Sequence, residues 1–245
     1  MTRKTYQLEV CANSVSSALE AQEGGADRIE LCQALELGGL TPSYGQIRLA
    51  KQLLHIGVHV LIRPRAGDFL YSDHEYDEIK ADIAFCREAG CDGVVVGMLR
   101  ENGSVDTKRI AELIELANPM HVTFHRAFDV CRDPFEALEA IIGSGCRKLL
   151  TSGMKSTAWE GIELIKALVA QAHGRIEIMP GSGINADNIG QIASITGARE
   201  FHSSAKIVQP SGMAYMNNAV SGMGGEVWMS SKEKIRQLAD ILKNL

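Results

Sequence analysis

Eight short runs typical of β-strands, each followed by a segment with helical signals, divide the sequence into repeating units. The runs are near-continuous in apolar residues, as in Val94-Val95-Val96, which is the pattern of parallel strands covered on both faces. A chain with this alternation is restricted to few architectures, because parallel strands need crossover connections. The runs are Gln7 to Cys11, Arg28 to Cys32, His59 to Ile62, Gly93 to Gly97, His121 to Phe124, Lys148 to Thr151, Glu177 to Pro180, and Glu200 to His202.

The predicted fold class is α/β, a single (β/α)8 TIM barrel over residues 1–245, because eight such units fit a closed barrel of this length. A doubly wound open sheet is the alternative, but no Gly-x-Gly-x-x-Gly follows the first strand. A long loop at about 203–231 is expected between the eighth strand and the last helix. In a barrel, functional side chains lie at the C-terminal ends of the strands.

Helix boundaries are marked by local signals. Ser14 is predicted to cap the first helix, which Gly24-Gly25 then terminates. Asp133-Pro134-Phe135-Glu136 combines an N-cap, a first-turn proline and a capping-box glutamate ahead of the fifth helix. We expect Gly143 to close that helix.

The net charge of −5 and the lack of a basic stretch argue against nucleic acid or an anionic membrane as a primary partner. Met1 to Thr5 run directly into the first strand, without an apolar stretch that would suit a signal peptide or a membrane span. A cytoplasmic location is therefore predicted. The 6 cysteines would then be reduced, because structural disulfides are rare in that compartment.

A pattern of a carboxylate and a thiol occurs twice, as Leu8-Glu9-Val10-Cys11 and as Ile29-Glu30-Leu31-Cys32. Residues two apart in a strand share one face, so each copy places its glutamate beside its cysteine. On neighbouring strands both copies would converge on one place. Charged groups inside a protein are paired, hydrogen-bonded or metal-bound, so this place is either a set of ion pairs or a site.

Cys11 and Cys32 are expected about one strand spacing apart, roughly 4.8 Å. Such a pair suits a soft ion of low coordination number such as Cu(I), for which sulfur ligands are selected. Zn²⁺ would need two further ligands, and His125 or His202 would be the donors within reach. The structural alternative is that both thiols pack the end of the barrel without a metal.

Polar side chains are concentrated at the ends of the predicted strands and in the loops that follow. The alternative to a functional site is that Glu9 and Glu30 form interior salt bridges with Arg63 or Arg126. The polar positions are Glu9, Cys11, Glu30, Cys32, Arg63, Arg65, Asp68, His125, Arg126, Asp129, Thr151, Ser152, and His202 to Lys206.

A glycine-rich segment, Met179-Pro180-Gly181-Ser182-Gly183-Ile184-Asn185, follows the seventh strand and leads into a helix that Asn185 is expected to cap. Gly181 and Gly183 would let the backbone approach an anion closely, and barrels often bind phosphate between the loops after strands seven and eight. Ser204 would add a hydroxyl and Lys206 a positive charge. A tight structural turn is the alternative.

Taken together, these segments resemble the copper homeostasis protein family CutC over essentially the whole chain. The resemblance implies a TIM barrel, a cytoplasmic location and a role in copper tolerance or trafficking, with Cys11 and Cys32 as the matching Cu(I) thiols. Two departures are visible: Ser182 stands in a usual Pro-Gly-Gly-Gly-Ile, and Met216 replaces an arginine. The segments that carry the resemblance are Leu8 to Cys11, Gly24 to Cys32, Gly38 to Ser43, Ile62 to Phe69, Thr123 to Asp129, Leu150 to Gly153, and Glu200 to His202.

The competing hypothesis is an enzyme that acts on a small anionic or phosphorylated metabolite, since the strand ends carry more arginines and carboxylates than copper needs. Glu9 or Glu30 would be the general acid or base, with His125 as its partner. A binding or scaffold protein is a third hypothesis, and a homodimer is expected in each case. The expected anion-binding residues are Arg63, Arg65, Asp68, Arg126, Asp129, Ser152, Gly181, Gly183, Ser204 and Lys206.

Overall fold

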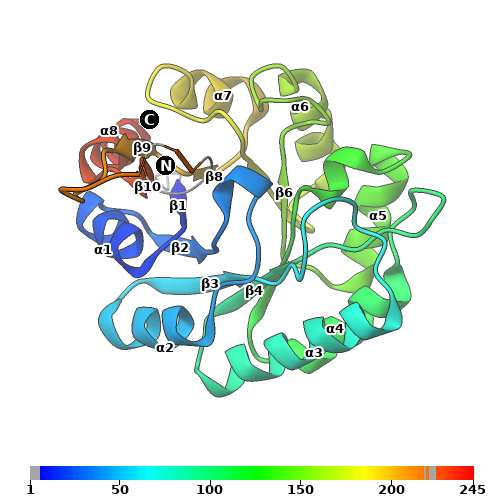
Figure 1. The fold of residues 1–245 in the computed structure, drawn as a ribbon. Helices are drawn as coiled ribbons and strands as arrows, with labels where there is room; N and C mark the ends of the chain where they lie inside the picture. The colour runs from blue at the N-terminus through cyan, green and yellow to red at the C-terminus, as the bar shows by residue number, and fades with distance from the viewer. Residues whose placement is uncertain (1–5, 218, 221–224) are drawn as a thin grey trace.

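Eight parallel strands pair with one another in chain order and form the wall of a barrel (Figure 1). The computed structural model describes residues 6–217, 219–220 and 225–245, so Met1 to Thr5, where no signal peptide is expected, lie outside it. The strands are β1 (Gln7–Ala12), β2 (Arg28–Leu31), β3 (Gly57–Leu61), β4 (Gly93–Val96), β5 (His121–Phe124), β6 (Lys148–Thr151), β7 (Glu177–Pro180) and β8 (Glu200–Ser203).

The hydrogen-bonded order runs from β7 back through β1 to β8, so β7 and β8 are the two ends of the ladder. These ends lie next to each other, because the Ser203 hydroxyl donates to the Ile184 carbonyl at 2.8 Å. The predicted (β/α)8 barrel is therefore confirmed. Its strands are buried almost throughout, as expected for parallel strands that are covered on both faces.

Helices surround the barrel on its outside (Figure 1). The first and last helices lie side by side and complete the ring, where Lys232 forms an ion pair with Glu23 at 2.5 Å. Among the described residues, no helix is both long and apolar enough to span a membrane. The helices are α1 (Val15–Gly24), α2 (Tyr44–Leu53), α3 (Asp73–Glu88), α4 (Thr107–Ala117), α5 (Pro134–Ser144), α6 (Ile162–Ala172), α7 (Ile189–Thr196) and α8 (Lys232–Lys243), with the 3-10 turns η1 (Leu35–Leu37) and η2 (Arg126–Val130).

The local helix signals are largely confirmed. The Ser14 hydroxyl accepts from the Ser17 N–H at 3.0 Å, and Gly25 ends α1 with a φ of 92°. Asp133 caps α5, but the prediction that Gly143 closes this helix is wrong. The helix continues to Ser144, and Gly145 ends it with a φ of 96°, a left-handed conformation that glycine adopts without steric cost.

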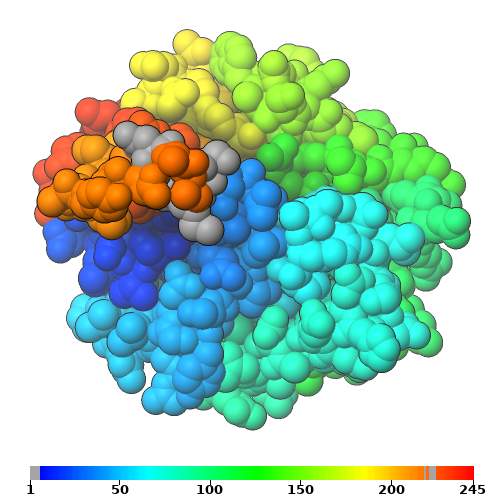
Figure 2. Space-filling view, in the orientation of Figure 1, coloured from blue at the N-terminus to red at the C-terminus, as the bar shows by residue number. Residues whose placement is uncertain are grey.

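The segment between β8 and α8 contains a small antiparallel sheet of β9 (Lys206–Gln209) and β10 (Val227–Ser230). It falls within the range that the sequence predicts as a long loop, of which residues 218 and 221–224 lie outside the described part. Figure 2 shows this orange segment raised on the face toward the viewer, beside the blue N-terminal part. It places Lys206 near the C-terminal ends of β8 and β1.

Candidate functional site

The two copies of the glutamate and cysteine pattern lie on adjacent strands, in parallel register. Cys11 is opposite Glu30 and Glu9 is opposite Arg28, while Cys32 follows the end of β2. The two cysteines are diagonal neighbours, and their Sγ atoms are 3.4 Å apart. The expected proximity of the thiols is therefore present, and their sulfur atoms are closer than one strand spacing.

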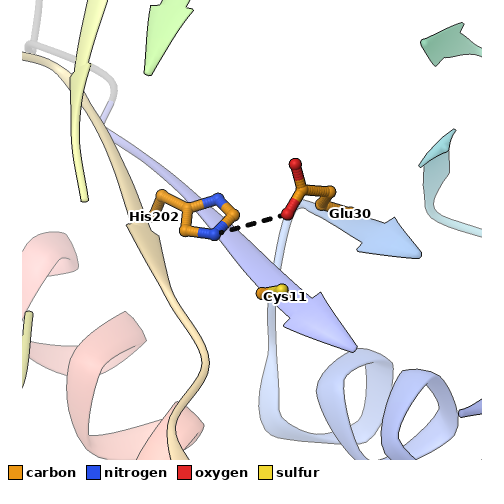
Figure 3. Close-up of side chains that lie close together, drawn as sticks. All are labelled: Cys11, Glu30 and His202. Atoms are coloured by element: carbon orange, nitrogen blue, oxygen red, sulfur yellow. Dashed lines mark ion pairs between the residues drawn. The ribbon is translucent and has the colours of Figure 1, made fainter. Parts of the chain in front are cut away.

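Three buried groups from three strands converge at this point, as Figure 3 shows. Ligand atoms of Cys11, Glu30 and His202 all lie within 4.8 Å of one another. The Nε2 atom of His202 is 3.6 Å from a carboxylate oxygen of Glu30. With Cys32 behind Cys11, the cluster offers two sulfurs, one imidazole nitrogen and one carboxylate to a metal ion.

His202 lies between two carboxylates, since its Nδ1 is also 2.8 Å from Glu9. Burial alone would lower the pKa of His202, but Glu30, Cys11 and Glu9 together raise it well above its usual value. Burial also raises the pKa of Glu30. The hydrogen bond with Cys32, reinforced by burial, raises the pKa of the Cys11 thiol. A metal that binds these groups must therefore displace protons.

Below this cluster, a layer of paired charges fills the barrel interior. Arg28 donates to Glu9 at 2.5 Å and to Glu200 at 2.5 Å, and Lys148 donates to the same Glu200. Burial raises the pKa of Glu9, but Arg28 and His202 outweigh it and lower the pKa overall. The interior salt bridges that the sequence suggests are thus present for Glu9, but its partner is Arg28 rather than Arg63 or Arg126.

A cavity of about 320 Å³ lies above the thiols, at the C-terminal ends of the strands. Cys11, Glu30 and His202 line its base. The expected residues Arg63, His125, Arg126, Gly183, Ser204 and Lys206 line it as well, whereas Glu9 lies underneath and does not. Among the described residues, the lining comprises Cys11, Glu30, Leu35, Gly38, Leu61, Arg63, Phe69, His125, Arg126, Leu150, Ser182, Gly183, Ile184, His202, Ser203, Ser204 and Lys206.

Arg63 is a buried cation without an acidic partner among the described residues. Its guanidinium donates to the backbone carbonyls of Leu37, Gly39 and Gly67, at 2.9 to 3.0 Å, and lies 5.1 Å from the centroid of the Phe69 ring. Its Nε is buried and has no hydrogen-bond partner in the described part of the chain. An unpaired positive charge raises the electrostatic potential of this wall of the cavity.

His125 is held in a neutral state beside Arg63. Its Nδ1 accepts from the Ala127 N–H at 3.1 Å, and its buried Nε2 has no partner among residues 6–217, 219–220 and 225–245. Burial and the nearby Arg63 charge lower the pKa of His125 to about 3. The imidazole is therefore neutral at physiological pH, with one ring nitrogen free for a ligand.

The loops after β7 and β8 face this wall. Within the described residues, the backbone N–H groups of Ser182, Gly183 and Ser204 make no hydrogen bond. Ser182 has a φ of 73°, an unusual value for a residue with a side chain. Lys206 lies on the ring of Trp228, 4.3 Å from its centroid. The predicted anion loop therefore presents free donors to the cavity.

Five expected anion-binding residues lie outside the cavity lining. Arg65 pairs with Glu75 and Asp68 away from the cavity. Asp129 accepts from Arg126 at 2.7 Å and from Ser152 at 2.9 Å, so Asp129 and Ser152 connect the segments that follow β5 and β6. Gly181 packs under His202, and a Cβ atom there would be 2.5 Å from Leu150 Cδ1.

The expected cap at Asn185 is wrong. Helix α7 begins at Ile189 after Asn188, and Asn185 instead accepts from the Asp187 N–H at 2.9 Å. A polar turn therefore separates the glycine loop from the helix, and the donors at the cavity are loop amides rather than amides of α7.

Arg28, His59, Lys148 and Glu200 lie with Glu9 in the layer of buried polar groups and are not among the residues predicted from the sequence. Strand phase was the available signal. Arg28 is two residues before Glu30, and Glu200 is two before His202, so each shares a strand face with a residue of the site. The apolar side of the cavity, to which Leu35 and Phe69 contribute, was not predicted either.

The chain is similar to known proteins over most of its length. A family model described as the CutC family matches residues 6–207. The family protein CutC of Bacteroides thetaiotaomicron is 53% identical over 232 residues, which cover 94% of this chain and 93% of that protein. The human copper homeostasis protein cutC homolog is 47% identical over 247 residues, which cover 98% of this chain and 90% of that protein. The crystal structure of CutC from Streptococcus agalactiae has a TM-score of 0.78 at 36% identity and covers 82% of this chain and 99% of that chain.

Proposed function

The chain belongs to the CutC family, and on that premise we propose that it is a cytoplasmic copper homeostasis protein that binds Cu(I) through Cys11 and Cys32. The observation that carries this proposal is the buried pair of thiols, 3.4 Å apart at the base of the cavity. Thiolates select Cu(I) over the harder divalent ions. The protein would contribute to copper tolerance or trafficking by holding the ion in this site.

The geometry of the pair restricts how it holds an ion. With metal–sulfur bonds of about 2.3 Å, the length for zinc thiolates, a linear arrangement needs sulfurs about 4.6 Å apart. The observed 3.4 Å is shorter, so an ion bound without movement of the strands has a bent coordination. A bent pair leaves one side of the ion open to a third ligand. His202 supplies such a donor once it has lost its proton, whereas the Glu30 carboxylate is a harder ligand.

Removal of both thiols tests the proposal directly. We expect the variant that combines Cys11→Ser with Cys32→Ser to lose Cu(I) capture against a competing chelator, while Cys146→Ser retains it. Cys146 is buried far from the site in sequence and tests whether any buried thiol suffices. Retained affinity in the double variant, with an unchanged circular dichroism spectrum, would rule the site out.

Zn²⁺ serves as the second metal in this test, because the two thiols with His202 and Glu30 would supply four ligands. We expect Cu(I) to be captured from a chelator that outcompetes the protein for Zn²⁺. We expect His202→Gln to lower the affinity for Zn²⁺ more than the affinity for Cu(I). A tetrahedral zinc site loses one of its four ligands, whereas Cu(I) keeps both thiolates.

Binding or turnover of a small anionic metabolite is the second candidate function, and the unpaired Arg63 with the free Nε2 of His125 favours it. Glu30 would be the general acid or base with His125 as its partner, since both line the cavity and Glu9 does not. A panel of phosphorylated and carboxylated metabolites should then raise the melting temperature, and Arg63→Met should abolish the shift. Absence of any shift would exclude this function.

A further inference from the structure

We propose that copper reaches this site as an anionic Cu(I) complex of a small thiol that carries carboxylate groups, and that the cationic wall of the cavity binds those carboxylates. The inference rests on the proposed copper function and adds the chemical class of the copper donor. Four features of the cavity support it: its charge, its free hydrogen-bond donors, the difference in exposure between the two thiols, and its size.

The charges that line the cavity are mainly positive. Arg63 and Lys206 have no carboxylate partner among the described residues, and Arg126 pairs with Asp129. Glu30 is the acidic side chain that lines the cavity, and it faces the imidazole of His202. A free Cu(I) cation is repelled by such a wall, whereas a complex with net negative charge is attracted to it.

Unpaired donors accompany these charges. In the part of the chain that the structure describes, the N–H groups of Ser182, Gly183 and Ser204 have no acceptor. The buried Nε2 of His125, which also lines the cavity, has no partner within the same residues. Carboxylate oxygens on a ligand are acceptors that suit loop amides and cations together. A naked metal ion would leave all of these donors unused.

The two thiols differ in exposure, and this difference sets the order in which they bind copper. Cys11 lines the cavity, and Cys32 is fully buried behind it. An entering complex therefore meets Cys11 first. In the exchange, the Cys11 sulfur forms a bond to copper, the bond from copper to the donor sulfur breaks, and the Cys11 proton passes to the leaving thiolate. Copper stays in the Cu(I) state, so no oxidant or reductant is needed.

The cavity has space for such a donor. Its volume of about 320 Å³ lies at the lower end of the range for small-molecule pockets. The bent coordination that the 3.4 Å sulfur separation favours leaves a position for the donor sulfur during exchange. The carboxylates of the same molecule can then reach the cations of the wall, so one ligand would use both halves of the cavity.

The test compares three Cu(I) donors that share a thiol and differ in charge: mercaptosuccinate, with two carboxylates, neutral mercaptoethanol, and cationic cysteamine. Copper uptake by the protein is followed at low ionic strength, with each donor at the same concentration of free thiol. We expect uptake from mercaptosuccinate to be faster by about tenfold or more, and to slow as salt is added.

Lys206→Gln alone should lower this preference, and the variant that combines Arg63→Gln with Lys206→Gln should lose most of it. Lys166→Gln, a matched loss of charge on the exposed side of α6, should keep it. Equal uptake from all three donors would overturn the inference but leave copper binding intact. A preference that survives in both cavity variants would overturn the role of the cationic wall. Absence of uptake from every donor would contradict the copper function itself, and this inference with it.

Discussion

Glu9 is fully buried, and its carboxylate is held by Arg28 at 2.5 Å and by His202 at 2.8 Å. Loss of one member of a buried ion pair leaves the other charge without compensation. We expect Glu9→Gln to lower the free energy of unfolding by about 3 kcal/mol, measured by urea denaturation. The exposed pair of Glu139 with Arg175 is the control, and Glu139→Gln should change stability little. Equal effects of the two substitutions would contradict this account.

Gly97 is required for the position of His125. A Cβ atom at residue 97 would lie 2.2 Å from His125 Nδ1, so Gly97→Ala must displace the ring. We expect a loss of about 1–3 kcal/mol in the free energy of unfolding, as for other overpacked interiors. Loss of the hydrogen bond between Ala127 N–H and His125 Nδ1 would appear as a shifted Ala127 amide resonance.

Gly143 provides the matched control for this substitution. It lies in the exposed interior of α5, and a Cβ atom there would meet no other atom within 4 Å. Gly143→Ala should therefore stabilise the protein by about 0.5–1 kcal/mol, because alanine loses less backbone entropy in a helix. Destabilisation by both alanines would show that the effect at Gly97 is not due to the contact with His125.

The proximity of Cys11 and Cys32 could be predicted from the sequence, because strand phase alone places both thiols on the inner face. The ion-pair partner of Glu9 could not. Arg28, Arg63 and Arg126 are all basic residues at strand ends in the sequence. Their partners depend on the register between strands, which places Arg28, the first residue of β2, opposite Glu9. Arg63 instead meets backbone carbonyls, which no sequence pattern indicates.

At the scale of secondary structure elements, the N-terminus of α5 has a well-defined cap. The Asp133 carboxylate accepts from the N–H groups of Phe135 and Glu136, at 2.9 and 3.0 Å. We expect Asp133→Ala to lower the free energy of unfolding by about 1 kcal/mol, and Asp133→Ser to restore most of this loss. Thermal denaturation of the two variants measures the difference, and an equal loss in both would argue against a capping role.

The strands could be predicted to within one or two residues, because short runs with buried apolar residues alternate with segments that carry helical signals. The pair β9 and β10 was not predicted. Their side chains are mostly exposed, so burial imposes no alternating pattern on the sequence. The end of α5 shows a similar limit, since Gly143 and Gly145 are both plausible terminators and only the backbone conformation distinguishes them.

At the scale of the whole molecule, two buried histidines make stability depend on pH. Burial lowers the pKa of His59 to about 4, and burial with the Arg63 charge lowers that of His125 to about 3. An unfolded histidine has a pKa of about 6.5, so below that pH the unfolded state binds protons that the native state does not. Stability should therefore fall as pH is lowered from about 6.5 toward 4.

Urea denaturation at pH 7 and pH 5 measures this effect, which amounts to about 2 kcal/mol for each histidine at pH 5. His125→Gln should make the loss between the two pH values smaller than in the unsubstituted protein. His173→Gln is the control, because His173 lies at the exposed end of α6. An identical pH dependence in all three proteins would show that His125 is not held neutral in the fold.

The layer of paired charges around Glu9 and Arg28 has a further consequence for traffic through the site. It fills the barrel below the thiols with buried side chains, so the cavity does not continue through the barrel as a channel. A molecule that delivers an ion and a molecule that removes it must therefore both approach from the C-terminal ends of the strands, one after the other. Under the proposed copper function, the site would be filled and emptied in turn, and the donor and the acceptor of copper would compete for the same face of the cavity.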